Sequence, residues 1–263
     1  MKRIWIVGLA LLMVVTGFSS FAQEKPEKIK VLLISGDDVG PFHDWREIAD
    51  STRKVLENAC RFEVVECEDT FILDSNAALD KYDVILLTGF NANTPTISDQ
   101  AKENLLNFVK SGKGFMVNHL ASASFKEWDE FGELCGRKWV MGTSGHGPRS
   151  MFTANVVNKE HPITQGLEDF QIFDELYSKL QGRSKIEVLV TADSEWSGNT
   201  EPLLFVREYG QGRVVQNAFG HDHKAIENET NKILLVRSCE WAATGKVTCC
   251  GACAKACASS SAQ

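Results

Sequence analysis

The sequence predicts an α/β fold: a doubly wound, mainly parallel sheet with helices on both faces. Two observations support this prediction. Residues 29–35 and 82–88 are almost continuously apolar, as are strands that are buried on both faces of a parallel sheet. Between such runs apolar residues recur at helical spacing, and strands that alternate with helices are joined by right-handed crossovers.

In the first half of the chain, strands alternate with helices. Ser98 occupies the N-cap position of one helix, and Gly112 suits its C-terminal end. The elements expected here are strands at 29–35, 62–66, 82–88 and 114–118, and helices at 44–59, from Ser98 to Gly112, and from Ser122 towards Cys135.

The second half is richer in strands and ends in one helix. Strands are expected at 151–157, 186–192, 203–208 and 213–219, the last two joined by a turn at 209–212, and a closing helix at 225–243. In doubly wound sheets ligands bind where the strands end. We therefore expect the loops 36–44 and 89–96 and the turn at His119 to form the site.

The composition is that of an acidic globular protein. The 263 residues include 28 Lys and Arg against 35 Asp and Glu, a formal net charge of −7, and 43% are hydrophobic. Without a dense basic stripe, such a chain is a poor candidate for binding nucleic acid. The length and the apolar content fit one large domain, which we place at residues 23–245.

The N-terminus has the three regions of an export signal. Lys2 and Arg3 precede an apolar stretch at 4–15, and residues 20–22 supply small side chains before a cleavage site. The stretch is short for a hydrocarbon core of ~30 Å. We expect residues 1–22 to be removed and the mature protein to reach the periplasm or the extracellular space without an integral membrane span. An uncleaved anchor is the alternative.

Half of the eight cysteines lie in the tail, residues 246–263. Thiols tend to pair in an oxidising compartment. The tail contains C-x-x-C spacing, which could hold a metal, but it lacks a second ligand pair at zinc-finger distance. We therefore expect a disordered, partly disulfide-linked tail. Cys60 and Cys67 flank a helix-to-strand turn, and their pairing stays open.

Several histidines follow strands. His119 comes directly after the strand 114–118, where it could be a base, a metal ligand or a structural group beneath a helix. His221 and His223 follow a later strand; alternation would place both on one face, whereas a turn would leave His223 in solvent. His146 lies between two glycines, in a loop of the kind that closes over pockets.

Asp174 and Glu175 are adjacent carboxylates just before Tyr177. They either cap the start of a helix or transfer protons. His161 precedes a proline and is expected to fix a turn. The turn after residue 118 lacks the cysteine of an amidotransferase, and the chain lacks Walker A, G-x-G-x-x-G, G-x-S-x-G and H-E-x-x-H motifs. Their absence argues against a nucleotide-driven enzyme or a helical zinc protease.

Six motifs in order resemble the ThuA-like (trehalose utilisation) family, over about residues 29–243. They are Gly36 with His43-Asp-Trp45, the segment Gly112 to His119, the segment His161 to Leu167, the segment Asp174 to Tyr177, the segment Tyr209 to Arg213, and Gly220-His-Asp222. The chain departs from the family's usual pattern at Asn118, where glycine or a small aliphatic residue is typical, and in its cysteine tail.

The resemblance implies a class I glutamine amidotransferase-like, flavodoxin-like fold without the amidotransferase cysteine. It also implies a role in carbohydrate catabolism, often beside enzymes that handle 3-keto sugars. We therefore expect an isomerase or lyase that transfers a proton next to the ketone of an oxidised sugar or glycoside, and not a glutamine amidotransferase. The alternative is a non-catalytic sugar-binding or accessory protein on the same fold.

For such an enzyme, His119 is the expected base, Glu175 the second proton-transfer group, and His146 and His221 donors or ligands. The residues expected to bind substrate are Gly36, His43, Trp45, Asn118, Tyr177 and Asp222. No cofactor is firmly implied; if a divalent metal is bound, the expected ligands are His119, His146, His221 and His223. The expected partner is a small-molecule sugar or glycoside, and homo-oligomerisation is left open.

Overall fold

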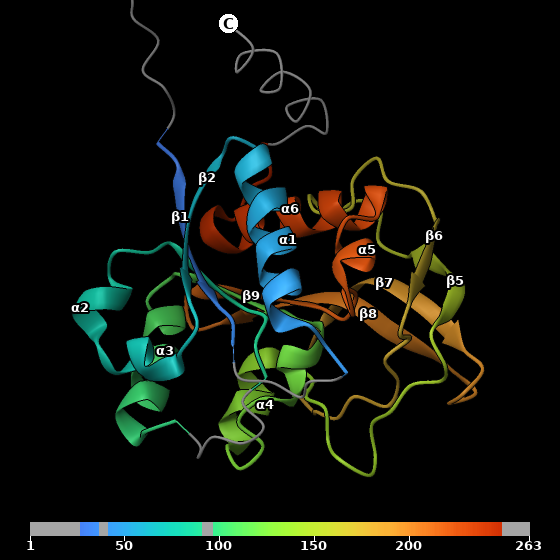
Figure 1. The fold of residues 1–263 in the computed structure, drawn as a ribbon, viewed down its shortest axis with the longest axis horizontal. Helices are drawn as coiled ribbons and strands as arrows, with labels where there is room; N and C mark the ends of the chain where they lie inside the picture. The colour runs from blue at the N-terminus through green and yellow to red at the C-terminus, as the bar shows by residue number, and fades with distance from the viewer. Residues whose placement is uncertain (1–26, 37–41, 91–96, 249–263) are drawn as a thin grey trace, which may run out of the picture.

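In the described part of the chain, residues 27–36, 42–90 and 97–248, the computed structural model contains a nine-stranded sheet with helices on both faces (Figure 1). The strand order is β2-β1-β3-β4-β9-β8-β7-β5-β6. The strands are β1 (Ile29–Ile34), β2 (Phe62–Cys67), β3 (Val84–Leu87), β4 (Gly114–Asn118), β5 (Ser150–Val156), β6 (Phe170–Asp174), β7 (Glu187–Ser194), β8 (Asn199–Tyr209) and β9 (Gly212–Asn217).

The half of the sheet formed by β2, β1, β3, β4 and β9 is parallel. Every residue of β3 and β4 is buried, which explains why these segments are apolar runs without alternation. The predicted α/β class is therefore confirmed. Because these strands are parallel, their carboxyl ends meet at one edge of the sheet.

The other half of the sheet is antiparallel, with β8, β7, β5 and β6 added in turn beyond β9. The sheet is thus mixed, and the parallel order holds for its first half. Strand β6 was not predicted from the sequence. Its buried residues alternate with the exposed Gln171 and Phe173 over only five positions, so it lacks a continuous apolar run.

The helices form one layer on each face of the sheet. The helices are α1 (Trp45–Asn58), α2 (Asn76–Leu79), α3 (Asp99–Lys110), α4 (Asp129–Cys135), α5 (His223–Ile226) and α6 (Glu229–Thr244), with 3-10 turns η1 (Thr70–Asp74) and η2 (His119–Ala123). Residues of α1, α5 and α6 pack against one face, and residues of α2, α3 and α4 pack against the other (Figure 1).

Two helices predicted as continuous are divided. After η2, Phe125 has a φ of +50°, in the left-handed region that cannot continue a helix, and α4 begins only at residue 129. The closing helix is split into α5 and α6 because the Asn228 side chain accepts hydrogen bonds from the backbone N–H groups of Thr230 and Asn231 and caps α6.

Some predictions lie beyond the described residues. The expected signal peptide, residues 1–22, falls there, as does most of the expected cysteine tail. Among the residues that are described, no helix has both the length and the apolar character needed to cross a bilayer. Cys67 is a free thiol, so it does not pair with Cys60.

Arg213 joins the start of β9 to the end of α6. Its Nε donates to the carbonyls of Trp241 and Ala242, and its Nη2 donates to those of Gly112 and Ala243, at 3.0–3.1 Å. We expect Arg213→Met to lower the free energy of unfolding by about 1–3 kcal/mol, because these carbonyls lose their donors. Urea denaturation measures this change. An unchanged free energy of unfolding would contradict it.

Candidate functional site

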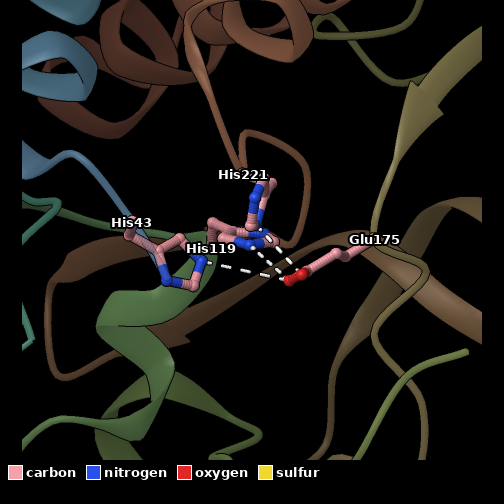
Figure 2. Close-up of side chains that lie close together, drawn as sticks. All are labelled: His43, His119, Glu175 and His221. Atoms are coloured by element: carbon pink, nitrogen blue, oxygen red, sulfur yellow. Dashed lines mark ion pairs between the residues drawn. The ribbon is translucent and has the colours of Figure 1, made fainter. Parts of the chain in front are cut away.

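Four side chains converge at the edge where the parallel strands end: His43, His119, Glu175 and His221 (Figure 2). His43 precedes α1, His119 follows β4, Glu175 follows β6, and His221 follows β9. Each offers one ligand atom, and these atoms all lie within 4.8 Å of one another. The topology therefore brings together three histidines and a carboxylate that are far apart in the sequence.

Glu175 is the centre of this group, which we call the histidine cluster. Its Oε2 lies 3.4 Å from Nε2 of His119, 3.5 Å from Nε2 of His146 and 3.9 Å from Nε2 of His43. Its Oε1 lies 3.1 Å from Nδ1 of His221. Among the described residues, every ion-pair partner of Glu175 is a histidine. One carboxylate thus faces four imidazoles.

His119 is aimed into the cluster by a sharp backbone turn. Its φ is +46°, a left-handed conformation that residues other than glycine rarely adopt. Its Nδ1 lies 2.7 Å from the carbonyl oxygen of Ala218. A carbonyl only accepts hydrogen bonds, so Nδ1 carries a proton, and in the neutral ring Nε2 presents a lone pair to Glu175.

Asp174 fixes the backbone of two members of the cluster, Glu175 and His221. Its buried carboxylate accepts hydrogen bonds from the N–H groups of Gly220 at 2.7 Å, His221 at 3.1 Å and Glu175 at 2.9 Å. Burial raises the pKa of Asp174, although the nearby His119 ring and these three N–H groups oppose the rise. Asp174 therefore locks β6 to the loop after β9.

Burial and the neighbouring charges shift the pKa values of His43, His119 and Glu175. Burial, followed by repulsion from His119 and His221, lowers the pKa of His43 to about 3, so this ring is neutral at physiological pH. Burial alone would lower the pKa of His119, but Glu175 and Asp174 raise it. Burial would likewise raise the pKa of Glu175, but His119 and His221 hold it far below its usual range. The pocket thus accepts positive charge beside one carboxylate.

Three aromatic rings form one wall beside the cluster. Tyr177 stacks on His119 with ring centroids 4.1 Å apart, and Trp139 lies 4.6 Å from Tyr177. The His146 ring stacks with that of Tyr177, with centroids 5.9 Å apart. The His146 side chain is 33% exposed, against 2% for His119. A molecule entering from solvent can therefore touch His146, and Trp139 is partly exposed as well.

Three residues predicted to bind substrate lie at the same edge. Trp45 and Asn118 line a small cavity next to His43. The amide oxygen of Asn118 already accepts a hydrogen bond from Asn217 at 3.0 Å, which ties β4 to β9. Gly36 has a φ of +91°, and a Cβ there would lie 2.3 Å from a backbone oxygen, so this position requires glycine for packing.

Asp222 and His223 stand outside the cluster. One oxygen of Asp222 caps α5 by accepting from the N–H of Ala225, and the other pairs with Arg149 at 2.6 Å. Nδ1 of His223 lies 2.8 Å from a carboxylate oxygen of Glu47 on α1. Two arrangements were left open for this segment, and the structure has the one in which His221 faces the site and His223 does not. His43, which was expected to bind substrate, lies among the residues that could bind a metal ion.

Sequence reasoning did not single out Trp139. Its backbone N–H donates to the carbonyl of Ser122, which holds the loop before His146 against η2. The stretch between α4 and β5 has neither helical nor strand periodicity, so His146 was the one signal that pointed to this part of the site.

Comparison with known proteins identifies the family. The model of the ThuA family, described as trehalose utilisation, matches residues 30–242. The chain belongs to the ThuA-like family. Membership places this ThuA-like protein in carbohydrate utilisation. No protein with a curated description matches it.

Solved structures agree with this assignment. The crystal structure of a ThuA-like protein from Parabacteroides merdae is 28% identical and covers 84% of this chain and 92% of its own, with a TM-score of 0.74. One from Bacteroides uniformis is 18% identical over 88% of this chain and 98% of its own, with a TM-score of 0.67. A β-galactosidase from Rahnella sp. R3, 14% identical, resembles 82% of this chain with 32% of its own length at a TM-score of 0.56. These last two likenesses concern the fold.

Proposed function

We propose that this ThuA-like protein is an exported isomerase or lyase that transfers a proton next to the ketone of an oxidised, 3-keto sugar or glycoside. The observation that carries the proposal is the histidine cluster together with the His146 ring beside it. Binding of a neutral sugar needs hydrogen-bond donors and apolar rings, but it does not need four imidazoles around one buried carboxylate. Such a cluster is suited to moving protons and to stabilising a developing negative charge.

The chemistry follows from the acidity of the carbon next to a ketone. A base takes the C2 proton, the electrons of the C–H bond form a C2=C3 double bond, and the carbonyl oxygen takes the negative charge. Return of the proton to C3, with transfer of the C2 hydroxyl proton to the former carbonyl oxygen, moves the ketone to C2. Alternatively, the carbonyl at C3 re-forms, the electrons of the C2=C3 bond form a C1=C2 double bond, and the C1–O bond breaks. The departing oxygen takes up a proton and leaves as an alcohol.

His146 is the best placed base in this proposal. Its Nδ1 lies 2.7 Å from the carbonyl of Gly147, so this nitrogen donates, and in the neutral ring Nε2, 3.5 Å from Oε2 of Glu175, keeps a lone pair. The sequence suggested His119 for this role. Because the His119 ring is buried under Tyr177 and hydrogen-bonded to Ala218, we assign it instead to the buried face of the site.

Of the remaining groups, some would stabilise charge in the intermediate and others would pack against the sugar. His119 and His221 are directed at Glu175, and on this side of the site an N–H donor or a bound cation would stabilise an oxygen anion in the intermediate. Trp139 and the His146 ring offer flat surfaces against which the carbon face of a sugar can pack. Export is part of the proposal because residues 1–22 have the pattern of a signal peptide.

The test is to incubate the mature protein with 3-keto-trehalose and with its 2-epimer, with and without a chelator, and to follow the products by NMR. We expect conversion of the keto sugar to a 2-keto isomer or to an unsaturated keto sugar plus free glucose, and no change in unoxidised trehalose. Saturable binding of the keto sugar without any conversion would instead support the non-catalytic sugar-binding protein.

A further inference from the structure

We propose that His43, His119, His221 and Glu175 bind one divalent first-row transition-metal ion, with His146 outside the ligand set. This inference goes beyond the proposed function, because the ion would be bound whatever the substrate is. It replaces the ligand set predicted from the sequence, in which His146 and His223 stood in place of His43 and Glu175.

The spacing of the ligand atoms suits a single ion. With metal–nitrogen distances of about 2.0–2.1 Å, neighbouring ligands lie about 3 Å apart and opposite ligands about 4 Å apart. In the cluster, the carboxylate of Glu175 lies 3.1 Å from Nδ1 of His221, 3.4 Å from Nε2 of His119 and 3.9 Å from Nε2 of His43. Small side-chain rotations would bring all four atoms into contact with one ion.

The ligand atoms also lack other partners. Within the described residues, both ring nitrogens of His43, Nε2 of His119, Nδ1 of His221 and Oε2 of Glu175 are buried and make no hydrogen bond. Buried polar atoms are normally satisfied, and each one left alone costs free energy. Here five such atoms belong to four side chains that converge at one place. Where lone pairs of these atoms face one another, they repel unless a cation lies between them.

The surrounding contacts hold these ligands in the orientation that a metal requires. The second ring nitrogen of a metal-bound histidine usually donates to a carbonyl or carboxylate, which fixes the tautomer. His119 does this through Nδ1 and the carbonyl of Ala218. Asp174 accepts the backbone N–H groups of Glu175 and His221 and so sets the separation of these two ligands. The orienting contacts are therefore built into the fold.

The chemistry of the donors selects the class of ion. Three imidazoles and one carboxylate suit Zn²⁺, Mn²⁺, Fe²⁺ or Co²⁺, whereas Mg²⁺ and Ca²⁺ prefer oxygen ligands. A site with four protein ligands leaves at most two coordination positions free in an octahedral ion. Two adjacent oxygens of a hydroxyketone could occupy these positions.

The experiment measures metal binding by the full-length mature protein without substrate. The protein is stripped with a chelator and loaded separately with Zn²⁺, Co²⁺, Mn²⁺ and Mg²⁺, and bound metal is counted by elemental analysis alongside the melting temperature. We expect about one equivalent of Zn²⁺, Co²⁺ or Mn²⁺ with a rise in melting temperature, and neither effect with Mg²⁺. Mn²⁺ is included because it binds thiolates poorly, which separates this site from the cysteine tail.

Variants locate the ion. We expect His43→Ala and Glu175→Gln each to weaken Mn²⁺ binding by about 100-fold or more, because each removes a ligand. His223→Ala is the matched control, because it removes a histidine outside the cluster whose side chain is as exposed as that of His146. This variant should bind Mn²⁺ like the unmodified protein. Circular dichroism shows whether each variant is folded.

Two results would overturn the proposal. One is the absence of binding and of thermal stabilisation with all three transition metals. The other is one equivalent of metal that persists in both folded ligand variants, which would place the ion elsewhere. If metal binds as expected but the protein does not convert keto sugars, the metal site is supported and the proposed function is rejected.

Discussion

Glu175→Gln is expected to lower kcat on a keto sugar by about 10²–10⁴-fold, the range that a proton-transfer or metal-binding group typically contributes. Glu175 lies within 4 Å of His43, His119, His146 and His221 at once. Glutamine has nearly the same shape but no charge, and its amide nitrogen would donate where the cluster needs an acceptor. Initial rates at saturating substrate measure the effect.

The matched control is Glu240→Gln, because Glu240 is also a buried glutamate. It lies on α6, where it pairs with Arg61 and accepts a hydrogen bond from the backbone of Thr248, at the edge of the sheet where β1 and β2 begin. This variant should lose stability and keep its turnover per folded molecule. If Glu175→Gln kept its turnover as well, the histidine cluster would have no part in catalysis.

His146→Ala is expected to lower kcat by about 10²–10⁴-fold, as loss of a general base does. Its melting temperature should change little, because the side chain is one-third exposed and its one hydrogen bond is to its neighbour Gly147. Metal content should also be unchanged. The combination of full metal and lost turnover distinguishes a base from a ligand, since His43→Ala should lose both.

The control for His146→Ala is His161→Gln. His161 lies in a turn, accepts a hydrogen bond from the N–H of Ile163 and packs against Trp241 near the C-terminal end of α6, outside the cluster. We expect a change in stability and none in kcat per folded molecule. Loss of metal from His146→Ala would contradict the separation of base and ligands and would add His146 to the ligand set.

The parallel half of the fold could be predicted because its strands are buried on both faces. Residues in β1, β3 and β4 have no polar alternation, and short apolar runs of this kind, separated by helical patterns, are typical of the inner strands of a parallel sheet. Their order then placed His43, His119 and His221 at one edge of the sheet through the rule that ligands bind at strand ends. Three members of the cluster were thus located from local sequence.

The rest of the site depends on pairings that local sequence does not encode. Glu175 enters the cluster because β6 pairs with β5 at the far end of the sheet, and Asp174 is then bonded to the backbone of residues 46 and 47 positions away. From the residues next to Glu175 in the sequence, a helix cap could not be distinguished from a member of the site. His43 was expected at this edge as a residue that binds substrate. Its burial against His119 and His221, which makes it a possible metal ligand, arises only in the folded chain.

The most direct test of proton transfer beside a ketone is solvent exchange. 3-Keto-trehalose is incubated in D₂O with the metal-loaded mature protein, and the carbon-bound hydrogens of substrate and product are followed by NMR. We predict that the protein places deuterium on a carbon next to the ketone much faster than buffer alone, and that His146→Ala loses this exchange while it retains its metal. Exchange no faster than in buffer, with the keto sugar shown to be bound, would contradict the account.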